Sequence, residues 1–380
     1  MEILQYTKEQ NKFRERLREF LAKEVTPYAD DWEARGIVPK EVWKKMGQNG
    51  FLCMGVPPKY GGLGGDFRYS VIVADEMART NQEGLAAMLH TDVVVPYIET
   101  FGSGEIKAKY LPGCVSGDVI TAIAMTEPDA GSDLASMCTS AVEDGDDVLI
   151  SGSKIFISNG INSDLVVVAA RDPKIDNAHR AISLYLIEDQ TPGFSRGRRL
   201  AKMGFHSQDT AELFFSNCRI PKANRLGKKG MGFSMLMEKL QQERLSVTIA
   251  AVPIAEFLLE QTIHHCRTNV LSGKPMINHQ AVQFALVEMS TEVKLGRTFT
   301  DKLVMDHIEG KEITVETSMA KYWTTEMAKR IADRCMDLFG ESANYEKCPI
   351  VRGWRDVRLL SIFAGTNEIM KTVAAKFMGL

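Results

Sequence analysis

The sequence predicts an α+β fold in three parts: an N-terminal all-α domain, a central antiparallel β-barrel-like domain and a C-terminal four-helix bundle. Three observations support this prediction. Apolar residues recur at helical spacing near both ends of the chain. Short β-rich runs separated by Gly, Asn, Asp and Pro fill the middle. A chain of 380 residues is also too long for one hydrophobic core and suits two or three domains.

The first domain is expected over residues 1–118. Phe13, Leu17 and Leu21 recur at a spacing that places them on one side of a helix. Apolar-rich helical segments continue through residues 70–100. The sequence therefore predicts a helical domain at the N-terminus.

The second domain is expected over residues 119–227, where the pattern changes. Short β-rich runs separated by turn residues are typical of an antiparallel sheet or a barrel. The four clearest runs are DVLISGSKIFISNG, DLVVVAARD, AISLYLIED and AELFFSNCRI.

The third domain is expected over residues 228–380 and is helical again. Several long helices in succession favour a bundle. The helical stretches are residues 231–266, 278–309, 314–339 and about 366 to the end.

The composition is that of a soluble globular protein, with 44% hydrophobic and 25% charged residues and a net charge of −3. Nearly balanced charge offers no basic face for nucleic acid. No run of about 18 apolar residues stands out, so no membrane span is predicted. The seven cysteines are scattered and form no CxxC motif, which indicates reduced thiols and predicts a cytoplasmic protein.

Several catalytic motifs are missing from the sequence. The glycine run YGGLGGD, residues 60–66, lacks the GK[ST] ending of a phosphate-binding loop and predicts a tight turn. His264 and His265 are adjacent, so they point in different directions from a helix and cannot chelate a metal together. There is no HExxH and no GxSxG. We therefore expect neither a hydrolase nor a metal site.

The β-rich region offers one constellation of interest. Phe156 and Ser158 alternate along KIFISNG and share a strand face. An aromatic ring beside a hydroxyl can support a flat heteroaromatic ligand. Because such pairs are common in strands, this interpretation is one among several.

Five motifs in order resemble the acyl-CoA dehydrogenase family over essentially the whole chain. They are TEPDAGSD, KIFISNG, KMGFHSQDTAELFF, the helix that begins QQERL, and FAGTNEI. The resemblance implies FAD held between the second and third domains, an acyl-CoA substrate and an electron-transfer flavoprotein as acceptor. It also implies a homotetramer built as a dimer of dimers.

Members of that family remove the pro-R α-proton of the thioester while the flavin N5 takes a hydride from the β-carbon. Many carry the base just before the glycine of the last motif, where this chain has Ala364. A branch similar to the long-chain and isovaleryl-CoA dehydrogenases carries it where this chain has Glu243. A base of this kind needs a pKa raised by burial. The competing interpretation of Glu243 and its neighbour Arg244 is a solvated ion pair.

The resemblance also assigns further residues. Arg244 would organise the active-site backbone near the substrate, and Ser132 would lie near the CoA moiety. The residues expected to contact FAD are Met125, Thr126, Phe156 and Ser158 at the isoalloxazine, Thr366 and Glu368 toward the diphosphate or adenosine, and Gln280, which matches the family.

Asp92 stands in the apolar stretch LHTDVVVPYI, where relatives usually have an apolar or small residue. One interpretation makes it a second catalytic carboxylate, which would disfavour a long alkyl chain because an unpaired charge beside methylenes is costly. We therefore expect the substrate to carry a cyclic or compact acyl group, as in cyclohexanecarboxyl-CoA or cyclohex-1-enecarboxyl-CoA. The alternative is a structural Asp92 in a dehydrogenase of straight or branched fatty acyl-CoA.

The chain departs from the family where an arginine usually reaches the FAD pyrophosphate of a neighbouring subunit. Asn269 holds that place, and Asp337 and Glu341 stand in a segment that usually carries Gln and Gly. Acids near a diphosphate repel it. This departure motivates a rival hypothesis from another class, a flavin-free protein that binds acyl thioesters or acts in assembly. An acyl-CoA oxidase and the reverse, reductive direction also remain open.

Overall fold

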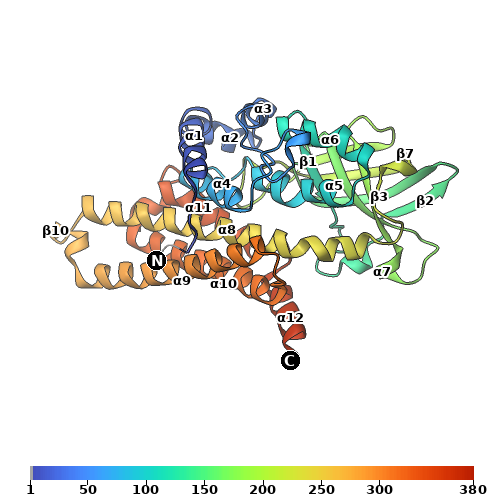
Figure 1. Cartoon of the computed structure of the whole chain (residues 1–380). Helices are drawn as coiled ribbons and strands as arrows, with labels where there is room; N and C mark the ends of the chain where they lie inside the picture. Colours follow the sequence, from blue (N-terminus) through green and yellow to red (C-terminus); the bar gives the residue numbers. More distant parts are fainter. Residues whose placement is uncertain (1–2) are drawn as a thin grey trace.

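A computed structural model describes residues 3–380 and confirms the three-part α+β architecture (Figure 1). The N-terminal helices are α1 Lys8–Glu24, α2 Ala29–Arg35, α3 Lys40–Gln48, α4 Arg68–Arg79, a π-helical turn η3 Leu89–Val94, α5 Val95–Phe101 and α6 Gly104–Ser116. The strands of the middle part are β1 Thr121–Ala124, β2 Ser140–Asp144, β3 Asp147–Ser158, β4 Leu165–Arg171, β5 Ile182–Glu188, β6 Phe194–Arg199, β7 Thr210–Pro221 and β8 Arg225–Leu226, with the short helix α7 Ala178–Ala181. The C-terminal elements are α8 Gly232–Thr268, the hairpin β9 Val270–Leu271 and β10 Lys274–Pro275, α9 Gln280–Ile308, α10 Thr314–Phe339, α11 Pro349–Leu360 and α12 Asn367–Met378.

Helix α1 begins where the sequence supplies both halves of a capping box. The Thr7 hydroxyl accepts from the Gln10 amide at 3.2 Å, and the Gln10 side chain accepts from the Thr7 amide at 2.9 Å. Phe13, Leu17 and Leu21 are all buried, as their spacing predicts.

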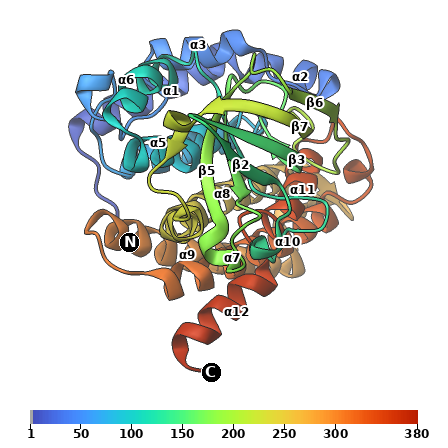
Figure 2. The ribbon, with the colours of Figure 1, turned by 90° about the vertical axis from the view of Figure 1, so that its right-hand side faces the viewer.

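The middle part is one eight-stranded sheet in the order β6-β7-β3-β2-β4-β5-β8, with β1 paired to β4. Most pairs are antiparallel, as expected, but β4 pairs in parallel with β1 and, at its last residue, with the first residue of β2. A continuous apolar run, LVVVAA, makes β4 buried on both faces, and parallel pairing is typical of such a strand. In Figure 2 the sheet faces the viewer, between the N-terminal helices and the bundle.

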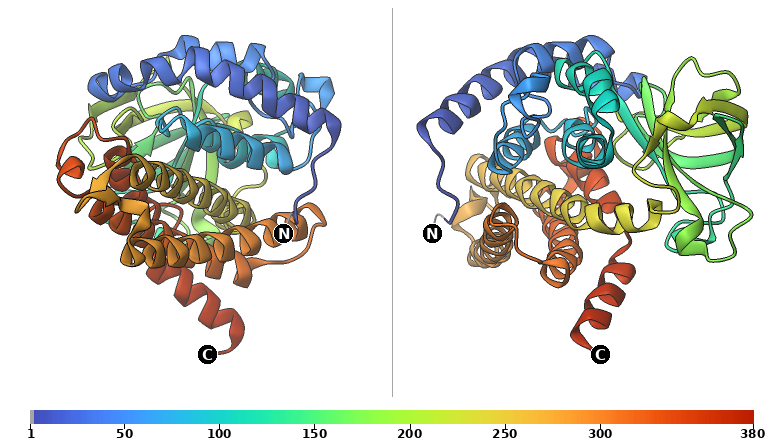
Figure 3. Two further views of the ribbon diagram at one scale, coloured as in Figure 1. Left: turned by 90° about the vertical axis from the view of Figure 1, so that its left-hand side faces the viewer. Right: turned by 45° about the vertical axis from the view of Figure 1, so that its right-hand side comes forward.

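The bundle contains one helix that the sequence pattern did not reveal. Residues of α8, α9, α10 and α11 share one apolar cluster, so α11 serves as the fourth helix. The last helix, α12, packs on α10 and projects from the bundle (Figure 3). Helix α8 is long and apolar enough to cross a membrane by length and composition, but 67% of its most apolar window is buried inside the protein, as in a core helix.

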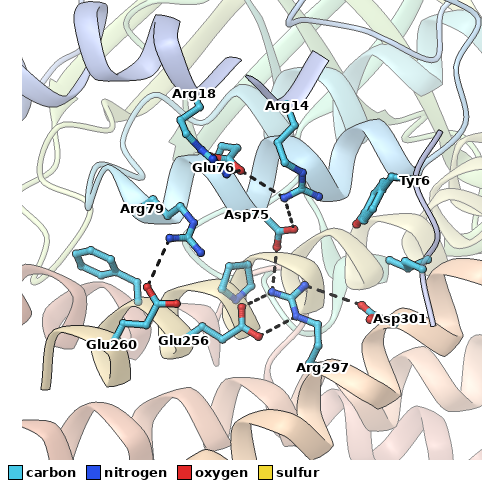
Figure 4. Close-up of a pocket in the computed structure, with 13 residues that line it drawn as sticks. Tyr6, Arg14, Arg18, Asp75, Glu76, Arg79, Glu256, Glu260, Arg297 and Asp301 are labelled. Atoms are coloured by element: carbon cyan, nitrogen blue, oxygen red, sulfur yellow. Dashed lines mark hydrogen bonds and ion pairs between the residues drawn. The ribbon is translucent and has the colours of Figure 1, made fainter. Parts of the chain in front are cut away.

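A polar cavity of about 280 Å³ lies where α1, α4, α8 and α9 meet (Figure 4). Asp75 of α4 lies 3.2 Å from the guanidinium of Arg14 and 2.9 Å from that of Arg297. At the end of α4, Arg79 pairs with Glu260 at 3.5 Å. These ion pairs connect the N-terminal helices to the bundle.

Candidate active site

A second cavity, of about 250 Å³, lies on the side of α4 and α8 that faces the sheet, and its walls are mostly apolar. It brings together five of the predicted site residues: Glu243, Met125, Thr126, Phe156 and Ser158. Other lining residues are Met88, Leu89 and Val93 from the π-helical region, Ser246, Val247, Ala250 and Ile254 from α8, and Phe363 and Ala364 from the loop before α12.

Glu243 occupies the wall that α8 supplies. Positions 243, 246, 247, 250 and 254 recur at helical spacing, so one side of α8 faces the cavity. The Glu243 carboxylate is 3% exposed and accepts a hydrogen bond from the Tyr97 hydroxyl at 2.6 Å. Burial, opposed by this hydrogen bond and by the charge of Arg244, raises the pKa of Glu243 to about 7.

The geometry does not fit a solvated ion pair at Glu243 and Arg244. Arg244 is only 6% exposed, and its Nη1 lies 3.5 Å from the Ser318 hydroxyl. Within residues 3–380, no cation lies within 4.0 Å of the Glu243 carboxylate. The carboxylate therefore lies buried at a mostly apolar cavity with a single hydroxyl donor.

Phe156 reaches the cavity because β3 is irregular. The register between β3 and β7 shifts between Lys154 and Ile157, and Phe156 itself has a φ of 61°. Phe156 is 64% exposed, an unusual state for a large apolar side chain, and it lines the cavity together with the hydroxyl-bearing Thr126 and Ser158. An exposed aromatic ring with two hydroxyls beside it fits a flat heteroaromatic ring such as that of a flavin.

A buried lysine fixes this wall. The Lys154 ammonium donates to the carbonyl of Met125 at 2.9 Å and to the carboxylate of Glu127 at 2.8 Å. The amide of Ile155 donates to the carbonyl of Thr126 at 3.0 Å. The turn after β1 and the strand that carries Phe156 are therefore held together.

A second buried lysine fixes the loop on the other wall. Lys321 donates to the carbonyl of Gly365 at 2.7 Å and to the side chain of Asn367 at 3.2 Å. Next to Gly365, Ala364 lines the cavity in a left-handed conformation with a φ of 54°. Burial, reinforced by the charge of Arg244, lowers the pKa of Lys321 to about 7.

Asp92 is buried near the cavity but does not line it. Its Oδ1 accepts from the Ser70 hydroxyl at 2.6 Å, and its Oδ2 has no hydrogen-bond partner in the described part of the chain. Its backbone carbonyl accepts from Gln242, the residue before Glu243, at 2.8 Å. Burial, opposed by the Ser70 hydrogen bond, raises the pKa of Asp92 to about 7.

The remaining predicted site residues lie outside this cavity. Ser132 is exposed in the turn after β1, and Gln280 is exposed at the start of α9. The Thr366 hydroxyl caps α12 by accepting from the Ile369 amide, and Glu368 lies in the first turn of that helix. A bound CoA or the outer half of a dinucleotide would extend beyond the cavity, so their positions leave their predicted roles open.

Two residues of the cavity region escaped the sequence analysis. Tyr97, the hydroxyl donor to Glu243, looked like one more aromatic residue in an apolar helix. Glu83 lines the cavity from the loop after α4. Burial, reinforced by nearby Asp356, raises the pKa of Glu83 to about 8. Nothing in the stretch NQEG distinguishes Glu83 from a surface acid.

Comparison with known proteins identifies related sequences. Three family models match: the N-terminal domain of acyl-CoA dehydrogenase over residues 7–118, its middle domain over 122–218 and its C-terminal domain over 230–379. The mitochondrial long-chain specific acyl-CoA dehydrogenase of Rattus norvegicus is 40% identical over 372 residues, which are 98% of this chain and 86% of that protein.

Solved structures of acyl-CoA dehydrogenases are also similar to this chain in fold and sequence. The acyl-CoA dehydrogenase of Geobacillus kaustophilus is 50% identical, with a TM-score of 0.97 and 99% of each chain covered. The butyryl-CoA dehydrogenase of Megasphaera elsdenii is 30% identical, with a TM-score of 0.95 and 100% of each chain covered.

Proposed function

Because this chain belongs to the acyl-CoA dehydrogenase family, we propose that it oxidises the Cα–Cβ bond of an acyl-CoA with Glu243 as the base that removes the α-proton. The observation that carries the proposal is a carboxylate with a pKa raised to about 7, buried in an apolar cavity and facing it. Such a group is deprotonated often enough near neutral pH to act as a base, and it binds a proton strongly enough to take one from carbon.

FAD is the cofactor of this family and supplies the hydride acceptor when bound. Phe156, Thr126 and Ser158 would hold its ring against the β-domain wall. Tyr97 stabilises the ionised Glu243 and orients its carboxylate. The apolar side chains along α8 keep water away from the reacting carbons.

For the acyl group we propose a saturated straight or branched chain. The cavity walls beside Glu243 are apolar, and Asp92 turns its carboxylate to Ser70 on α4. The long-chain specific relative is in keeping with this choice.

A cyclic acyl group is the second candidate, with Asp92 as a second base. The support for it is that Leu89 and Val93, in the same π-helical turn, line the cavity, and that Asp92 Oδ2 lacks a partner among residues 3–380.

The proposed partners are an electron-transfer flavoprotein and further copies of this chain in a homotetramer. Phe284, Val287 and Leu295 recur at helical spacing on α9 and are all more than half exposed, as is Phe377 on α12. An apolar face of this kind suits association of identical subunits. The cytoplasmic location and the domain limits at 118 and 227 stay predictions.

The test is an anaerobic titration of the visible flavin spectrum of the purified protein with palmitoyl-CoA, cyclohexanecarboxyl-CoA and cyclohex-1-enecarboxyl-CoA. We expect palmitoyl-CoA to bleach the flavin band. Bleaching by the cyclic thioesters alone would replace the straight-chain proposal with the cyclic one. A colourless protein that takes up no added FAD would support the flavin-free rival and contradict the enzyme proposal.

A further inference from the structure

We infer that Glu83 selects acyl chains that carry a neutral hydrogen-bonding group, such as a hydroxyl, at the end remote from the thioester. The inference rests on the proposed function and narrows its substrate class. Three features carry it: where Glu83 lies in the cavity, the lack of a partner for its carboxyl group, and the rigid support of its loop.

Glu83 and Glu243 lie toward opposite ends of the cavity. Helix α4 runs parallel to α8, because Val71 and Leu245 belong to one apolar cluster while Arg79, two turns later on α4, pairs with Glu260. Glu83 follows α4 and therefore lies beside the later part of the α8 wall, near Ile254. That residue is roughly 16 Å along the helix from Glu243. An acyl chain whose α-carbon is at Glu243 would point its tail toward Glu83.

The Glu83 carboxyl group lines the cavity among mostly apolar side chains, with Gln208 as a polar neighbour. Met77, Phe205, Ile254 and Leu360 line the cavity with it. Among residues 3–380, no side chain or backbone group hydrogen bonds to its carboxyl oxygens or forms an ion pair with them. Glu83 is partly exposed, so a chain that fills the cavity would displace water from it and leave its carboxyl group without a partner unless the chain supplied one.

The loop that carries Glu83 is fixed. The Gln82 side chain donates to the Ser207 hydroxyl at 2.7 Å and accepts from the Gly84 amide at 2.6 Å. A Cβ on Gly84 would lie 1.9 Å from the Ser207 hydroxyl, so the loop is pressed against the segment before β7. The backbone at Glu83 is therefore held at the cavity wall.

The chemistry favours a neutral partner. With its pKa raised to about 8, Glu83 is mostly protonated at neutral pH and can donate a hydrogen bond. A carboxylate at the end of the chain would be repelled by Glu83 when ionised and by Asp356, the acid that raises the pKa of Glu83. A hydroxyl both accepts and donates, so it satisfies the Glu83 carboxyl in either protonation state.

An unsubstituted chain of the same length would leave Glu83 without a partner against methylene groups. Sites that hydrogen bond a substrate hydroxyl reject the analogue that lacks it for this reason. Because the contact is far from the reacting carbons, it contributes equally to the bound substrate and the transition state, and its loss should raise KM rather than lower kcat.

The experiment compares octanoyl-CoA, dodecanoyl-CoA and palmitoyl-CoA with their ω-hydroxy counterparts in the FAD-loaded enzyme. We expect the wild type to favour the hydroxylated thioester about tenfold in kcat/KM at the chain length that reaches Glu83, and not at shorter lengths. Glu83→Leu should reverse this preference through KM, and Glu83→Gln should retain part of it. Glu105→Leu, which changes an exposed acid on α6 outside the cavity, is the matched control and should leave the ratio unchanged.

Equal ratios in wild type and Glu83→Leu at every chain length would overturn the inference while leaving the dehydrogenase proposal intact. If the wild type oxidises none of these thioesters, the proposed function fails and the specificity fails with it. Flavin content and the thermal midpoint of each variant show whether a changed ratio reflects recognition or a damaged fold.

Discussion

Helices α4 and α8 contribute to two cavities of similar size. One is lined by paired charged side chains and the other by mostly apolar side chains. In the polar cavity, of about 280 Å³, arginines from α1, α4 and α9 pair with acids from α4 and α8 (Figure 4). In the apolar cavity, of about 250 Å³, Glu243 and Glu83 lie with no cation within ion-pair distance in the described chain. On one side, ion pairs of these helices join the N-terminal helices to the bundle. On the other side, Glu243 of α8 and Glu83 of the loop after α4 line a cavity without a paired cation.

The acids of the two cavities differ in how closely cations approach them. Asp75 lies between two arginines, 3.2 Å from Arg14 and 2.9 Å from Arg297. Asp301, whose distance to Arg297 is 3.9 Å, is the poorly paired acid of the polar cavity, and burial raises its pKa to about 6. Glu243 and Glu83 have no such pair, and their pKa values rise to about 7 and 8. Groups of this second kind are suited to proton transfer and ligand recognition.

The largest expected effect is on Glu243. Glu243→Gln removes the base while keeping the shape, and we expect the rate of flavin reduction by a saturated acyl-CoA to fall roughly 1,000-fold. Anaerobic stopped-flow absorbance measures it. Glu238→Gln, an exposed acid on the same helix, is the control and should react at the wild-type rate. A Glu243→Gln enzyme within tenfold of wild type would show that the apolar cavity is not the catalytic one.

The polar cavity should matter for stability instead. Arg297→Met leaves Asp75 and Glu256 without the cation that lies 2.9 Å from each, and we expect the free energy of unfolding to drop by about 2 to 4 kcal/mol. Denaturant unfolding measures this, and kcat should stay within about twofold of wild type. Arg330→Met breaks an exposed pair with Glu292 and should cost less than about 1 kcal/mol. If both variants lost the same free energy of unfolding, the polar cavity would have no special structural role.

The pH dependence of activity tests the ionisation of Glu243 in the apolar cavity. Glu243 must be ionised to take a proton, so kcat/KM should rise with pH through about 7 and then level off. Tyr97 donates to the carboxylate and favours the ionised form. Tyr97→Phe removes that donor, so the pKa of Glu243 should rise and the activity profile should move by about one unit to higher pH. A profile that stays in place would mean that Tyr97 does not govern the ionisation of Glu243.

The smallest effect on activity is expected at Asp92. Asp92→Asn keeps an acceptor for Ser70, and kcat for a straight-chain substrate should stay within about threefold of wild type. A loss comparable to that of Glu243→Gln would instead establish Asp92 as a second base.

Replacing Asp92 should also change how the stability of the fold depends on pH. An acid whose folded-state pKa is raised destabilises the fold as pH rises from its unfolded value toward the folded one, here from 3.8 to about 7. Asn carries no such cost. Relative to wild type, the thermal midpoint of Asp92→Asn should therefore improve between pH 5 and pH 8, by about 3 °C.

Local patterns in the sequence were enough to predict the order of the secondary-structure elements and several residues of the candidate site. Helical and strand periodicities gave the order of helices, strands and helices, because each depends on neighbouring residues along the chain. The motif around Glu243, set against Ala364 in FAGTNEI, pointed to the base candidate, and the structure places both in one cavity. Phe156 and Ser158 were singled out on one strand, and both line that cavity.

The tertiary structure decided what depends on partners far away in the chain. Tyr97 meets Glu243 across 146 positions, and no local pattern contains that contact. Asp92 faces Ser70, while Glu83 faces the cavity, and in the sequence both are single acids near apolar residues. The direction in which a side chain points, and whether a counter-charge meets it there, follows from how α4, α5 and α8 pack. Periodicity sets which residues a helix buries, and only packing sets what they are buried against.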